Sequence, residues 1–474
     1  MVITAHFIDS DWNLHKRVIN FISITSHKGE AMGRVIEDCL KEWEIKKLFT
    51  ITVDNASAND HLVNYLKRRF CSNILSDYVH MRCVTQIINL VVTESMKESI
   101  ASIDRVRAAV KFIRASPARI QKFKDCVEIE RIQSNSLLCL DVCTRWNSTY
   151  MMLEAAQKLE LAFGRFEELE PQITSEVAVE GGMPKQEDWN NVRRLVTFLR
   201  CFYELILKVS DTSHVTSNNF FHDLSLLYYV LQEIKCEDDP QMSLMAGRMI
   251  EKCDKYWGGK SNKLNILIFV GVVFDPRYKL RYLILAMKEM YEEEIAIEVA
   301  EMVKSTILKI FNEYKNELSM QNQSMDPTQC KSSSLAIRDE EQSAENRARA
   351  RFRRLHSEVG GGENVSVLDK YLAEGNENTK DGENFNVLIW WKIHSYRFPI
   401  LSAIARDLLA IPISTVASKS AFSTGGRVLD SFRSSLTPQI VEALICVEDW
   451  LGGSPMLSHP CYKIWQSRRH LNEK

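Results

Sequence analysis

The stretch LFTITVDNASAND, residues 48–60, decides how the rest of the chain is interpreted. Its first part, 48–53, is rich in β-branched and aromatic side chains, which predicts a strand. Asp54 follows this strand and opens a polar loop before a helical apolar pattern at 61–70. A carboxylate at the C-terminal tip of a strand is well placed to hold a divalent metal ion. A turn Asp that caps the next helix fits the same spacing, so both interpretations stay open at this point.

The residues before this stretch predict the one clear α/β part of the chain. Residues 2–8 and 17–24 are rich in Val and Ile, and turn residues lie between them, so an antiparallel hairpin is expected. Apolar side chains at helical spacing predict a helix over 28–43.

Helical periodicity dominates from about Val84 onward. The composition changes at 319–366, where polar residues and a glycine run at 360–362 predict a disordered linker. A helical pattern returns at 367–450. The longest apolar stretch, 264–274, is far shorter than the ~20 residues that a membrane-spanning helix needs, so no membrane partner is expected.

Composition narrows the function classes. The 474 residues include 60 Lys and Arg against 62 Asp and Glu, a net charge of −2, which argues against a globally basic nucleic-acid binder but not against a local basic patch. Twelve cysteines are too few for a disulfide scaffold in a chain of this length, and none forms a Cys-x-x-Cys pair. Reduced, intracellular cysteines are therefore expected, without a zinc site.

Several further motifs occur in a fixed order along the chain. They are HMRC at 80–83 with INL at 88–90, DVCTRWNSTY at 141–150, FDPRYKL at 274–280, LDKYL at 368–372, the pair Trp390 and Trp391, and the segment from Ala417 to Trp450. Together with residues 52–60, this series resembles the hAT superfamily of transposases over nearly the whole chain. The resemblance is greatest to the plant, transposase-derived members that carry a BED zinc finger.

The resemblance implies an α/β plus mostly α fold. A ribonuclease-H-like core would be interrupted by a large helical insertion and followed by a helical C-terminal dimerisation region. It also implies DNA as a partner of low affinity, a homodimer or higher homo-oligomer, and a nuclear location. Active members cut and join DNA with two metal ions held by three carboxylates, and Asp54 corresponds to the second of these.

The chain departs from that pattern at several points. The first strand, with the first catalytic Asp, is expected before Met1, which would leave a truncated core whose inner strands expose unpaired edges. Gln86 replaces the histidine of a Cys-x-x-His motif that begins at Cys83, and Lys419 stands at the position of the third carboxylate. No Cys/His quartet has zinc-finger spacing. Asp54 is thus interpreted as a remnant, with no active catalytic residue, no metal and no cofactor expected.

Two groups of residues are candidates for DNA contact. Arg145 and Trp146 are placed to clamp a backbone or stack on a base, although a Trp in a helical pattern is commonly part of a core. The other candidates are Arg347, Arg349 and Arg351, which would contact phosphates or simply remain solvated beside the acidic run at 339–341.

The C-terminal block is expected to mediate self-association, with plain core packing as the alternative. The candidate dimerisation residues are Leu368, Tyr371, Leu372, Trp390, Trp391, Phe422, Leu444 and Trp450. The expected division of the chain is a partial ribonuclease-H-like core at 1–83, a helical insertion and transposase middle region at 84–318, the linker at 319–366, the dimerisation region at 367–452 and a tail at 453–474.

The functional interpretation is a transposase-derived, catalytically inactive protein that binds DNA and dimerises. Two alternatives remain. The first is an active transposase whose sequence is truncated at its N-terminus, and the second is a protein-interaction module without a DNA role. The near-neutral charge and the missing finger favour the second alternative.

Overall fold

The structure is a computed structural model of the chain. It describes residues 1–71, 75–134, 136–178, 181–211, 213–257, 265–323, 366–378, 385–428 and 436–451. In these ranges helices predominate, and the strands form two small two-stranded sheets.

The N-terminal hairpin matches the expected one closely. Strand β1, Val2–Ile8, pairs antiparallel with β2, Leu14–Phe21, and the register shifts once at Ile3/Thr4. The second strand begins earlier than the predicted 17–24 because Asp9 closes a tight turn. Its Oδ1 accepts the backbone N–H groups of Asp11 at 2.9 Å and Asn13 at 2.8 Å, so pairing starts directly after the turn.

A second unit packs two helices beside a short parallel sheet. Helix α1, Gly29–Glu42, lies against α2, Ser57–Phe70. A Cβ at Gly29 would lie 2.2 Å from the carbonyl oxygen of Ala58, so only glycine permits this approach. Strand β3 is limited to Ile51–Val53, shorter than the predicted 48–53, and it pairs parallel with β4, His80–Arg82.

The outer edge of the hairpin is covered rather than exposed. The backbone N–H of Val18 donates to Asp449 Oδ2 at 2.8 Å, and Trp450 Nε1 donates to the Val18 carbonyl at 3.0 Å. Both side chains belong to α20, Pro438–Leu451, the last described helix. Trp43 Nε1 donates to the Ile19 carbonyl at 3.1 Å. The helix therefore satisfies backbone groups of β2 that a bare edge strand would leave unpaired.

A large helical body follows β4, as the periodicity predicts. Its helices are α3 (Val84–Ser95), α4 (Ile100–Arg114), α5 (Pro117–Ile129), α6 (Trp146–Lys158), α7 (Glu160–Leu169), α8 (Gln172–Glu176), α9 (Gln186–Ser210), α10 (Phe220–Lys235), α11 (Pro240–Trp257), α12 (Leu267–Val273), α13 (Lys279–Met290) and α14 (Glu293–Gln323). Helix α14 thus runs into the segment predicted as a linker. The rest of that segment, 324–365, lies outside the described residues.

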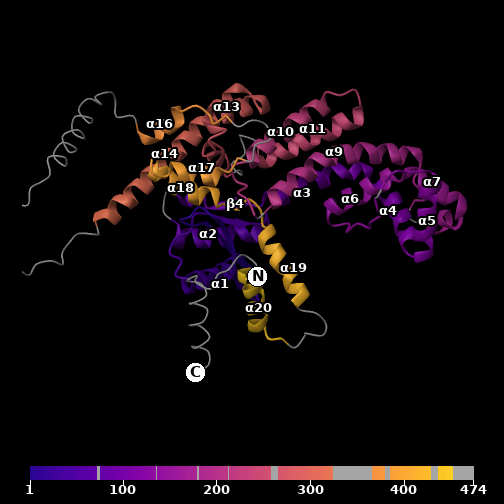
Figure 1. The fold of residues 1–474 in the computed structure, drawn as a ribbon, viewed down its shortest axis with the longest axis horizontal. Coiled ribbons are helices and arrows are strands. Elements are labelled where there is room, and N and C mark those ends of the chain that lie inside the picture. The colour runs from indigo at the N-terminus through magenta and orange to yellow at the C-terminus, as the bar shows by residue number, and fades with distance from the viewer. Residues whose placement is uncertain are drawn as a thin grey trace, which may run out of the picture.

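The C-terminal helices return to both parts of the molecule. They are α16 (Val367–Ala373), α17 (Val387–His394), α18 (Pro399–Leu409), α19 (Val416–Val428) and α20. Helices α16 to α18 lie beside α13 and α14, while α19 and α20 lie next to the hairpin (Figure 1). In the same view, α3 and α9 extend away from the sheets toward α4–α7 at the far end. None of the described helices is both long and apolar enough to span a membrane.

Candidate functional site

Asp54 directly follows β3, as the sequence predicts, and lies three residues before the first residue of α2, Ser57. Its Oδ1 accepts the N–H of Ala56 at 3.1 Å and the side-chain amide of Asn59 at 2.5 Å. Asn59 also donates to the Asp54 carbonyl at 3.3 Å. One oxygen of this carboxylate is therefore engaged in the turn that starts α2, which is the local role that the spacing allowed.

The start of α3 lies beside this turn. The Cys83 N–H donates to the Val53 carbonyl at 2.9 Å, and Gln86 Oε1 accepts the N–H of Asn55 at 3.1 Å. Gln86 thus fixes the backbone next to Asp54. The family resemblance leads us to expect a histidine at this position in relatives, and a histidine ring nitrogen is also an acceptor for this type of contact.

A third segment reaches the same place from the far end of the sequence. The Val84 N–H donates to the Ile413 carbonyl at 2.9 Å. Thr415 donates to the sulfur of Cys83 from its backbone N at 3.3 Å and from its Oγ1 at 3.2 Å. Cys83 is fully buried, so these contacts attach the start of α19 firmly to the start of α3. We call Asp54, Asn55, Cys83, Gln86 and Thr415 the Asp54 edge.

Lys419 lies one helical turn beyond this edge. Its N–H donates to the Thr415 carbonyl at 3.2 Å, and its side chain is exposed. The described ion pairs include none between Lys419 and Asp54. The structure therefore brings the segment of Lys419 to the Asp54 edge without joining the two side chains.

The residues at the edge do not fit a two-metal site. Within the described ranges, no three His, Cys, Asp or Glu side chains lie close enough together to share a metal ion. At the edge itself, one oxygen of Asp54 and the amide oxygen of Gln86 already accept hydrogen bonds. A protonated lysine has no lone pair to offer. No reaction step through a metal can be derived from this arrangement.

The candidate pair Arg145 and Trp146 is split between the surface and the core. Arg145 is exposed, whereas Trp146 begins α6 and is only 4% exposed. To stack on a base, the indole would have to leave its place in the core. Arg347, Arg349 and Arg351 lie outside the described residues.

Sequence reasoning missed the residue that fixes this loop, Asp141. Its carboxylate accepts Arg107 Nε at 2.8 Å, Arg107 Nη2 at 2.7 Å and Thr149 Oγ1 at 2.8 Å. Burial by itself raises the pKa of Asp141, but the hydrogen bonds from Arg107 and Thr149 outweigh it and hold the pKa below its usual value. A buried ion pair between residues 34 positions apart leaves no local signal in the sequence.

The candidate dimerisation residues also divide by burial. Leu368, Tyr371, Trp390 and Trp391 are buried inside this chain, Leu372 and Trp450 are half-buried, and Phe422 and Leu444 are exposed. The buried group is not available at the surface of this structure.

The buried aromatic residues form a second meeting point with the FDPRYKL motif. Trp391 Nε1 donates to the Phe274 carbonyl at 2.9 Å, and Tyr371 OH donates to the Val273 carbonyl at 2.9 Å. The buried Lys279 ammonium donates to the carbonyls of Tyr371 and Glu374, each at 3.2 Å. Burial lowers the pKa of Lys279. We call Phe274, Lys279, Tyr371, Trp390 and Trp391 the aromatic junction.

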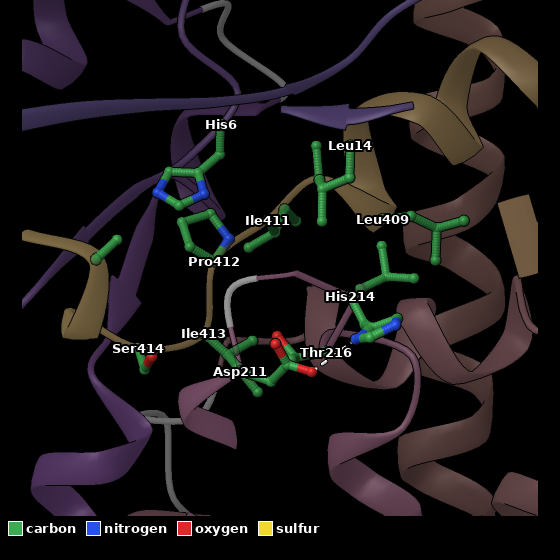
Figure 2. Close-up of a pocket in the computed structure, with 13 residues that line it drawn as sticks. His6, Leu14, Asp211, His214, Thr216, Leu409, Ile411, Pro412, Ile413 and Ser414 are labelled. Atoms are coloured by element: carbon green, nitrogen blue, oxygen red, sulfur yellow. Dashed lines mark hydrogen bonds and ion pairs between the residues drawn. The ribbon is translucent and has the colours of Figure 1, made fainter. Parts of the chain in front are cut away.

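A small pocket lies behind the segment that leads into α19. Figure 2 shows His6 above Pro412, with His214 beside Asp211 on the opposite side. His214 Nδ1 lies 2.7 Å from Asp211 Oδ2, and both side chains are exposed. Burial, and then the positive charge of Lys16, lowers the pKa of His6 to about 4, so this imidazole is neutral near pH 7. The arrangement holds a hairpin residue against residues 411–414 and assembles no group of catalytic residues.

Four family models match the chain. They are a ZBED1 RNase-like domain over 1–78, a ZBED1 RNase-like helical domain over 81–198, a hAT-like transposase with RNase-H fold over 218–314, and the hAT family C-terminal dimerisation region over 367–451. Together they bear out the expectation of a mostly helical chain with an RNase-H-like hAT part and a C-terminal dimerisation region.

Curated relatives match along nearly the whole chain. RICESLEEPER 2, a zinc finger BED domain-containing protein of Oryza sativa subsp. japonica, is 33% identical over 463 residues, which are 95% of this chain and 62% of the relative. RICESLEEPER 4 from the same plant is 32% identical, over 96% of this chain and 68% of the relative. The putative AC transposase of Zea mays is 32% identical, over 96% and 55%. The chain thus spans 62% of the length of RICESLEEPER 2.

Proposed function

This chain belongs to the hAT transposase-derived family, and we propose that it is a dimerising, DNA-binding member that does not cleave DNA. The proposal rests on one observation: three distant segments meet at the Asp54 edge, but the side chain delivered from α19 is Lys419. From the family resemblance we infer that an active member has a carboxylate at the position of Lys419, and that this chain has lost it.

The charge of Lys419 opposes a metal ion at this edge. Replacing a carboxylate by an ammonium changes the local charge by two units. At ~4 Å and an effective dielectric constant of ~20, each pair of unit charges interacts by roughly 4 kcal/mol. A fraction of that energy would weaken Mg²⁺ binding by orders of magnitude. Gln86 supports the backbone of Asn55 without supplying charge.

DNA binding is proposed from the family, whose relatives include a transposase and BED zinc finger proteins by name, and from the exposed Arg145. A nuclear location follows from such a role. The burial of Trp146 favours a second candidate function, a protein-interaction module without a DNA role. We also propose the division at 1–83, 84–318, 319–366, 367–452 and 453–474, with the third part as a linker.

A cleavage assay tests the proposal. The unaltered chain, Lys419→Glu and a matched control, Lys315→Glu on α14, are incubated with a duplex that carries a transposon end in Mg²⁺ or Mn²⁺. No cleavage is expected from the unaltered chain or the control. Cleavage by Lys419→Glu alone would identify Lys419 as the block, whereas metal-dependent cleavage by the unaltered chain would contradict the proposal.

A gel shift on random duplex DNA separates the two candidate functions. Binding that weakens steeply with salt is expected, and Arg145→Ala should reduce the slope of log affinity against log salt by about one. Arg34→Ala, an exposed site on α1, is the control and should leave the slope unchanged. Absence of binding at low salt would favour the interaction module.

A further inference from the structure

Helix α20 carries two apolar faces. One face packs on the hairpin, where Val441, Ile445 and Cys446 are buried around Val18. On the other face, Ile440 is 47% exposed, Leu444 43% and Leu451 68%, and Val447 is half-buried between them. A helix that packs on a domain by one face normally has a polar outer face.

The outer face has a regular spacing. Positions 440, 444, 447 and 451 follow one another at steps of four, three and four, which is the a/d pattern of a two-helix seam. We call these four residues the α20 stripe. Ala443, on the flank of the stripe, is small and permits a close approach of a second helix.

The position of the stripe and the other exposed apolar residues of the same region indicate which partner it binds. The stripe lies in the region that matches the hAT dimerisation model, 367–451, while four candidate interface residues of that region are buried in the chain's own core. Helix α17 has a competing exposed pair, Ile389 and Ile393, but it ends at His394 and offers barely two turns. The α20 stripe spans the whole of its helix.

We propose that the α20 stripe packs against the α20 stripe of a second copy of this chain. The inference rests on the proposed function, since it names the face through which the dimer forms. It also predicts that dimerisation is coupled to the order of β2. Asp449 and Trp450 of the same helix bind the backbone of Val18, so dimerisation orders β2 from the opposite side of α20.

Light scattering of the full chain over a range of concentrations tests the inference. The unaltered chain is expected to be a dimer. Leu444→Glu and the more exposed Leu451→Glu should each raise the dimer dissociation constant about tenfold or more, because an unpaired charge would be buried in the seam. Ile393→Glu on α17, where the side chain is 71% exposed, is the matched control and should remain dimeric.

Hydrogen exchange of Val18 provides a second readout that does not depend on particle size. Protection of its N–H should rise with concentration in the unaltered chain and stay constant in Leu444→Glu. If Ile393→Glu is monomeric and both α20 variants remain dimeric, the α20 inference is wrong while dimerisation stands. If the unaltered chain is monomeric at every concentration, the proposed dimerisation itself fails.

Discussion

The aromatic junction and the Asp54 edge both join segments that lie far apart in the sequence, but they do so with different chemistry. At the junction, the buried side chains of Lys279, Tyr371 and Trp391 donate hydrogen bonds to backbone carbonyls. At the edge, Gln86 accepts one hydrogen bond from the Asn55 backbone and Thr415 donates two to the Cys83 sulfur, while Asp54 remains partly exposed. The contacts that join the segments at the edge do not involve the side chain of Lys419. The fold at the edge therefore does not depend on a carboxylate at position 419.

The largest expected effect is at the aromatic junction. Trp391→Ala removes a fully buried ring that packs on Phe274 and Tyr371, and should lower the free energy of unfolding by about 3–5 kcal/mol. Urea denaturation measures the loss. Ile393→Ala on the same helix should change it by less than about 0.5 kcal/mol. If the two substitutions had equal effects, the aromatic junction would not contribute more to stability than the exposed face of α17, and the prediction would be wrong.

The next largest effect is a pH dependence of stability that comes from His6, which lies beside residues 411–414. The pKa of His6 is about 4 in the folded chain and about 6.5 when unfolded, so the unfolded state takes up the proton first. The contribution of His6 to stability should therefore fall by about 3 kcal/mol as pH falls from about 6.5 to about 4. Burial also lowers the pKa of His80 and of His222, so His6→Gln should reduce the total loss in urea titrations by about this amount, and the exposed His214→Gln should retain the full loss. A loss of the same size in His6→Gln and in the unaltered chain would contradict this assignment.

These contrasts also explain how far the sequence could be interpreted. The hairpin and long helices follow from apolar periodicity, which is local. Strand β4 was missed because His80–Arg82 is three residues long and has no alternation. The same apolar, aromatic composition serves a core and an interface, so only the structure separates buried Trp391 from exposed Leu444. The hydrogen bonds that Thr415 donates to the Cys83 sulfur join residues 332 positions apart and leave no local signal.

A smaller effect is expected where the edge is held together. Thr415→Val keeps the shape but removes the hydroxyl that donates to Cys83, and should cost about 1 kcal/mol. Thr144→Val, at an exposed loop position, should change stability by less than about 0.5 kcal/mol. In a double-mutant cycle with Cys83→Ala, the double variant should lose less stability than the sum of the losses in the two single variants, because both substitutions remove the same contact. Strict additivity would show that the contact contributes nothing.

The smallest effect is expected for Lys419 itself. Its side chain is exposed near the N-terminal end of α19, where the helix dipole disfavours a positive charge and alanine is the better helix former. Lys419→Ala should therefore leave stability unchanged or raise it by up to about 0.5 kcal/mol, and Lys419→Glu should be at least as stable. Thermal unfolding of the unaltered chain should not shift in millimolar Mg²⁺, because a ligand raises stability only where the folded state binds it. A loss above about 1 kcal/mol on Lys419→Ala that disappears in an Asp54→Asn background would instead place an ion pair between the two residues, and the Asp54 edge would then be joined by charge like the buried pair of Asp141 and Arg107.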